Sequence, residues 1–66
     1  MRYFNYEEIA RKAGIPEPKL EKLRQAIREE FPRDDMMYEL HLLRVCFAIQ
    51  EGHISPDEAI QSERAA

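Results

Sequence analysis

Apolar residues recur at helical spacing in four segments of the chain. In the second segment, Leu20, Leu23, Ile27 and Phe31 follow one another at steps of three, four and four residues, which places them on one stripe of a helix. No segment shows the strict apolar and polar alternation of a half-buried strand. The pattern predicts an all-α fold, a small four-helix domain over residues 1–66, with helices at about 6–13, 18–30, 35–51 and 56–64.

The ends of these helices are predicted from capping residues. Asn5 before the first helix and Glu8 three residues later match a capping box. Ser55 and Glu58 match the same motif before the fourth helix, with a proline at its first position. Gly14 follows the first helix, where a chain leaving a helix favours positive φ.

The third predicted helix is apolar on two sides. At 100° per residue, one arc holds Tyr38, Leu42, Val45, Cys46 and Ile49, and the other holds Met36, Leu40, Leu43 and Phe47. Glu39 and Gln50 separate the arcs along one edge, and His41 and Arg44 separate them along the other. A helix of this kind must be covered on both sides.

The other predicted helices provide too little apolar surface to cover both arcs. The first two helices cover one arc, and the fourth offers only Ala59 and Ile60. We therefore expect a two-fold homodimer contact or another protein partner. The predicted interface is either Leu40, Leu43 and Phe47 or Leu42, Val45 and Ile49, with Met37 as an exposed contact on the edge. Met36 is expected to pack in the core.

Charge is distributed unevenly along a chain whose net charge is -3. Residues 1–33 hold eight basic and six acidic residues, whereas residues 34–66 hold two and seven. A basic front and an acidic back would orient the protein on nucleic acid, or let the front of one molecule attract the back of another.

Residues 6–25, YEEIARKAGIPEPKLEKLRQ, carry small and apolar residues in the pattern of a helix-turn-helix. The matching positions are Ile9, Ala10, Ala13, Gly14, Ile15, Leu20 and Leu23. This stretch resembles helix-turn-helix regulators and is similar to the opening of MerR-type regulators, although no wing hairpin follows it. Pro16 and Pro18 stand in the turn, where these regulators usually have a Ser- or Thr-capped helix start. The resemblance implies DNA binding by the second helix.

The outward face of the second predicted helix would then carry the DNA contacts. It presents Pro18, Glu21, Lys22, Gln25 and Glu29, and phosphates repel its two acidic residues. The predicted nucleic-acid-binding residues are Lys12, Lys19, Lys22, Gln25 and Arg28. The basic residues would contact phosphates and Gln25 an adenine. Two functions remain open at this point: a small DNA-binding regulator, and a protein-interaction or homodimerisation module with no nucleic-acid role.

No catalytic residue, metal site, cofactor or small-molecule substrate is predicted. Cys46 lies on an apolar arc, where a thiol behaves as a small hydrophobe. His41 and His53 are not at the i, i+4 spacing of a helical metal site. The single cysteine cannot form an intramolecular disulfide, and the chain has neither a leader pattern nor a long apolar run. We expect a non-enzymatic cytoplasmic protein with no membrane segment.

Overall fold

The computed structural model describes residues 3–65 and confirms the prediction of an all-α fold, with four helices and no strand in that range. The helices are α1 (Tyr6–Lys12), α2 (Glu17–Glu30), α3 (Asp35–Gln50) and α4 (Pro56–Ala65). Each predicted helix differs from the observed one by a single residue at one end. In the same range, no helix has the length and apolar character needed to cross a membrane.

Local capping interactions explain why the helix ends were predictable. Asn5 Oδ1 accepts a 3.4 Å hydrogen bond from the Glu8 N–H at the start of α1. Before α4, the Glu58 N–H donates to Ser55 Oγ at 3.1 Å, and the Ser55 N–H donates to Glu58 Oε1 at 3.0 Å. Gly14 after α1 has a φ of 73°, the left-handed conformation that glycine adopts without a steric cost.

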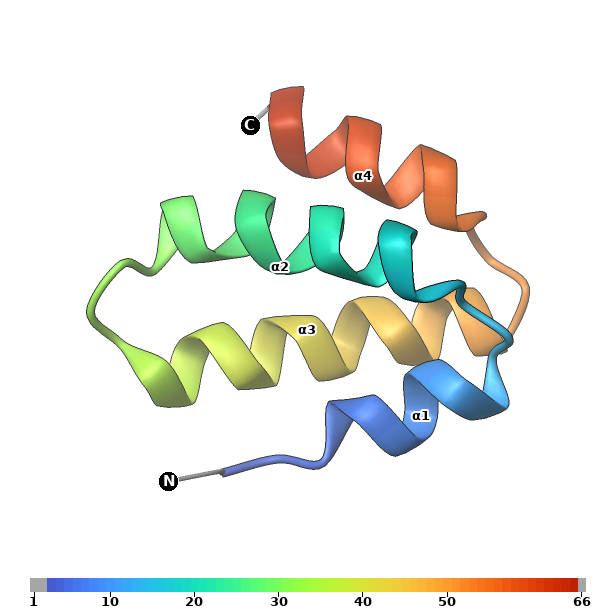
Figure 1. Ribbon diagram of the computed structural model, residues 1–66, viewed down its shortest axis with the longest axis horizontal. Helices are drawn as coiled ribbons and strands as arrows, with labels where there is room; N and C mark the ends of the chain where they lie inside the picture. The colour runs from blue at the N-terminus through green and yellow to red at the C-terminus, as the bar shows by residue number, and fades with distance from the viewer. Residues whose placement is uncertain (1–2, 66) are drawn as a thin grey trace.

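The long α3 helix lies in the middle of the molecule (Figure 1). In that view α1 lies on one side of it, α2 lies on the other, and α4 packs on the far side of α2. Helix α1 packs mainly on α3, whereas α2 packs mainly on α4 and also contacts α3. The largest fully buried side chains come from the two longest helices: they are Leu23, Ile27, Leu42 and Cys46. The accessible surface is 4393 Å², close to the roughly 4,400 Å² typical of a monomer of this mass. A single chain therefore buries about as much of its surface as a monomer of this size usually does.

A buried carboxylate fixes the segment that precedes α1. Glu39 Oε1, on α3, accepts hydrogen bonds from the backbone N–H groups of Tyr3 and Phe4 at 2.8 and 2.9 Å. Glu39 is only 9% exposed, so the edge of α3 on which it separates the two apolar arcs is covered at this point. The N-terminal segment covers this edge, and its two N–H groups satisfy the carboxylate that it buries.

Candidate functional site

The two arcs of α3 have different environments in the folded chain. Leu42 and Cys46 are fully buried and Ile49 is nearly so, and all three belong to the main core cluster. Val45 is half-buried against that cluster. The alternative interface of Leu42, Val45 and Ile49 is therefore wrong, because the chain's own helices already cover this arc.

The opposite side of α3 is open. We call Met36, Leu40, Leu43 and Phe47 the exposed arc. Met36 is 48% exposed and Phe47 is 42% exposed, so the expectation that Met36 packs in the core is wrong. Leu40, Leu43 and the neighbouring Met37 are half-buried, and of these only Leu43 packs against the core. The exposed arc is thus an apolar stripe that the chain leaves largely uncovered.

Charged residues stand at the two ends of the exposed arc. Arg33 precedes α3 and is exposed, and Glu51 follows α3 and is also exposed. Asp34 and Asp35 lie at the same end as Arg33, but each has a partner within the chain. Asp34 Oδ1 accepts a 3.0 Å hydrogen bond from the Met37 N–H as the cap of α3, and Asp35 pairs with an arginine of α2. The arc therefore has a basic side chain at one end and an acidic one at the other.

Much of the basic charge of the front half is neutralised inside the molecule. The Arg24 guanidinium binds Glu17 at 2.7 Å, Glu21 at 3.1 Å and Glu7 at 3.3 Å, and Arg24 Nε donates to the Tyr6 hydroxyl at 2.9 Å. Burial lowers the pKa of Arg24, but the hydrogen bonds to Glu17 and Tyr6 outweigh it and raise that pKa overall. Arg24 is thus a fixed cation that joins α1 to α2.

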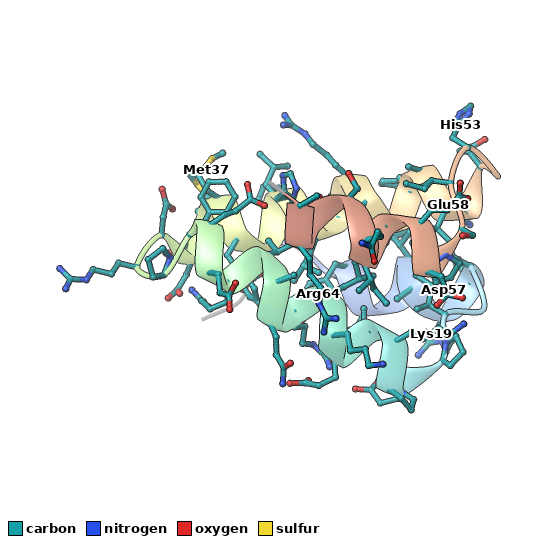
Figure 2. All side chains as sticks on the ribbon, turned by 90° about the horizontal axis from the view of Figure 1, so that it is seen from above. Lys19, Met37, His53, Asp57, Glu58 and Arg64 are labelled. Carbon is teal, nitrogen blue, oxygen red and sulfur yellow. The ribbon has the colours of Figure 1, made fainter. Side chains whose placement is uncertain are left out.

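Two of the residues predicted to contact DNA, Lys19 and Arg28, also form ion pairs within the chain. Lys19 Nζ lies 3.1 Å from a carboxylate oxygen of Asp57, and Figure 2 shows the two residues next to each other. Arg28 pairs with Asp35 at 2.9 Å and lies 3.7 Å from the centre of the Tyr38 ring. The remaining three predicted contacts are exposed and form no ion pair with another residue of the range 3–65: they are Lys12, Lys22 and Gln25.

Three helices bring together a cluster of potential metal ligands. Glu30 ends α2, His41 lies in α3 and Glu63 lies in α4; their ligand atoms are all within 4.8 Å of one another. His41 Nε2 is 3.0 Å from Glu63 Oε2. The His41 ring also contacts Phe31, with ring centres 5.8 Å apart. Sequence spacing within one helix gave no signal for this site, because its residues come from three helices.

The two carboxyl groups of this cluster influence each other. A hydrogen bond with Glu63 raises the pKa of Glu30. Burial raises the pKa of Glu63, but its hydrogen bonds with Glu30 and His41 outweigh burial and lower that pKa overall. The Glu63 side chain is 13% exposed, so a negative charge there has little water to stabilise it.

Comparisons with protein-family models, with curated proteins and with solved structures give no match to this chain. Function is therefore inferred from three features of the surface. These are the exposed arc of α3, the basic residues of α1 and α2, and the cluster formed by Glu30, His41 and Glu63.

Proposed function

We propose that this protein is a homodimerisation module in which two copies associate through the exposed arc of α3. The observation that supports the proposal is the exposure of Met36 and Phe47 on one continuous stripe of a chain that otherwise closes its core. Apolar stripes that stay open on small proteins mark interaction sites. A second copy is the simplest partner, because a two-fold contact needs a surface that complements only itself.

The spacing of the exposed arc suits an antiparallel pair of α3 helices. Its residues follow at steps of four, three and four, the spacing of the seam in a two-stranded coiled coil. This order reads the same in both directions. An antiparallel second copy would therefore place Met36 opposite Phe47 and Leu40 opposite Leu43, in each direction, with helices crossing at about 20°.

The charges at the ends of the arc favour the same orientation. In that pairing Arg33 of each copy would lie beside the end of the other copy's α3, where Glu51 is exposed. Opposite charges brought together at both ends would fix the register of the pair. Antiparallel helices also place opposite ends of their dipoles side by side. A parallel arrangement would instead put Arg33 beside Arg33.

DNA binding by α2 and the end of α1 is a second proposal, supported by the exposed side chains of Lys12, Lys22 and Gln25. It has less support than dimerisation. Lys19 and Arg28 are already in ion pairs, so a phosphate would compete with Asp57 and Asp35 for them. Glu21 and Glu29 lie on the same exposed face of α2 and would repel the DNA backbone.

Sedimentation equilibrium of the wild type, Phe47→Glu and Gln61→Glu tests dimerisation. Gln61 is exposed on α4, so its variant adds the same charge away from the arc. At concentrations on the order of 500 µM, where even a weak dimer is populated, the wild type and Gln61→Glu should exceed the monomer mass of 7.9 kDa. Phe47→Glu should remain monomeric with an unchanged far-UV spectrum.

A wild type that stays at 7.9 kDa throughout this range would rule out the dimer. The same experiment with a random-sequence DNA duplex at about 50 mM salt tests the second proposal, since phosphate contacts are strongest at low salt. Co-sedimentation that is lost in a Lys12→Ala, Lys22→Ala double variant would support DNA binding.

A further inference from the structure

Within the part of the chain that the structure describes, the cluster of Glu30, His41 and Glu63 has no lysine or arginine partner, unlike the other acidic groups that meet across helices. Its one basic group is the His41 imidazole, which is charged only when protonated. Three carboxylates surround Arg24, while Asp35 pairs with Arg28 and Asp57 pairs with Lys19. Within residues 3–65, no lysine or arginine forms an ion pair with Glu30 or Glu63. A cation bound between the two carboxyl groups would compensate the repulsion between their negative charges.

We infer that Glu30, His41 and Glu63 bind a divalent transition-metal ion, for which Zn²⁺ is the best match. The class of ion follows from the imidazole of His41, because its ligand atom is nitrogen. Ca²⁺ and Mg²⁺ take oxygen ligands, whereas imidazole nitrogen suits zinc and its neighbours in the first transition row. One histidine and two carboxylates, with water as the fourth ligand, make a set that tetrahedral Zn²⁺ accepts.

The distances within the cluster are close to those that such an ion requires. Ligand bonds of about 2.0–2.2 Å at a tetrahedral ion place neighbouring ligand atoms about 3.4 Å apart. His41 Nε2 and Glu63 Oε2 are 3.0 Å apart, and all three ligand atoms lie within 4.8 Å. Glu30 is exposed at the end of α2, so its side chain is free to turn toward the ion. Contact with Phe31 orients the His41 ring.

A hollow beside the cluster leaves room for the remaining ligand. It measures about 200 Å³ and lies between α3 and α4, and His41 and Glu63 both line it. Val45 and Ala59 form part of its apolar wall. Water or another small ligand on the ion would occupy this hollow, while the apolar wall would limit competition from bulk solvent for the protein ligands.

An ion at this position would link α4 to the rest of the fold. Only Ala59 and Ile60 of α4 are buried, so apolar packing holds this helix less firmly than it holds α2 or α3. The three ligand residues belong to α2, α3 and α4. Binding to the folded chain alone would raise its stability by mass action. The inferred role is therefore structural: the ion clamps α4 in place.

Isothermal titration of the full chain with ZnCl₂, after treatment with EDTA, tests the inference. We expect one ion per chain and a higher unfolding temperature when Zn²⁺ is present. Glu30→Gln and His41→Gln should each weaken binding about tenfold or more, since each removes one of three ligands. Because Glu30 is exposed, its neutral variant should fold like the wild type and remain a valid test if the His41 variant is unstable.

His53→Gln is the matched control. His53 is exposed in the loop after α3, and Figure 2 places it at the opposite end of the molecule from Met37, which lies one turn from His41. This variant should bind Zn²⁺ as the wild type does. Co²⁺ provides a second readout, because its visible absorption reports the ligand set directly.

Two results would overturn the metal site. One is the absence of binding at about 100 µM Zn²⁺, which would mean that the two carboxyl groups share only a proton. The other is binding that survives Glu30→Gln and His41→Gln but is lost in His53→Gln, which would identify adventitious coordination by the exposed loop.

Discussion

The two faces of α3 are built from similar residues but have different roles in the molecule. Leu42 and Cys46 on one face are fully buried, whereas Met36 and Phe47 on the other are exposed. Residue type does not separate them, since both faces are apolar over the whole length of the helix. What separates them is the placement of the other three helices, which surround one face and leave the other open. We therefore expect changes on the buried face to affect stability, and changes on the exposed arc to affect association.

Leu42→Ala should produce the largest effect. Leu42 is fully buried between helices, and truncating such a leucine costs about 2–5 kcal/mol through lost burial and a cavity. The whole free energy of unfolding of a 66-residue domain is about 3–10 kcal/mol. Urea denaturation followed by circular dichroism measures the loss. A loss below about 1 kcal/mol would show that this face of α3 is not the centre of the core.

Cys46 on the same face should make stability fall at alkaline pH. Burial raises the pKa of its thiol from 9.0 to about 11. The folded state therefore keeps the proton that the unfolded state releases, so this contribution is complete below about pH 9 and is lost between about pH 9 and 11. Over that window the wild type should lose about 2–3 kcal/mol more than Cys46→Ala.

The alkaline experiment compares urea denaturation of both proteins at several pH values. Subtracting the variant removes the effects of the other groups that titrate in the same range, including Tyr38, whose pKa burial also raises. A difference between the two proteins that does not change from about pH 8 to about pH 11 would mean that the thiol is accessible to water in the folded state.

Phe47→Ala should have the smallest effect on the isolated chain. Phe47 is exposed on the open face, and truncation of such a side chain stays within about 0.5 kcal/mol when no partner is bound. Unfolding measured at low micromolar concentration should thus match the wild type. At higher concentration the wild type should become more stable and the variant should not, because dimer formation adds to the stability of the wild type alone. If the wild type and the variant were equally stable at every protein concentration, Phe47 would not belong to an interface.

The helices could be predicted from sequence because their signals are local. Ser55 and Glu58 hydrogen-bond each other's backbone N–H groups within one turn. The positive φ of Gly14 lets the chain leave the first helix. The stripe of Leu20, Leu23 and Ile27 likewise follows from the helical repeat, and all three are buried. None of these features depends on where the other helices lie.

The candidate sites could be predicted only in part, because they depend on packing between distant segments. Periodicity identified two apolar arcs on α3, but it could not decide which one the chain covers. Glu39 has the pattern of a surface residue, but it is buried and its carboxylate accepts a hydrogen bond from a segment 35 residues away. Glu63 and His41 are 22 residues apart, a separation that no spacing rule of a single helix detects.

The arrangement of the helices makes the chain one cooperative unit. The first helix packs on the third and the second packs on the fourth, so partners alternate along the sequence. A chain divided in the loop between α2 and α3 would give two fragments, each lacking the surface on which its helices pack. Neither half would be an independent foldon. The two halves would form their native contacts only in each other's presence, either within one intact chain or when the two fragments associate.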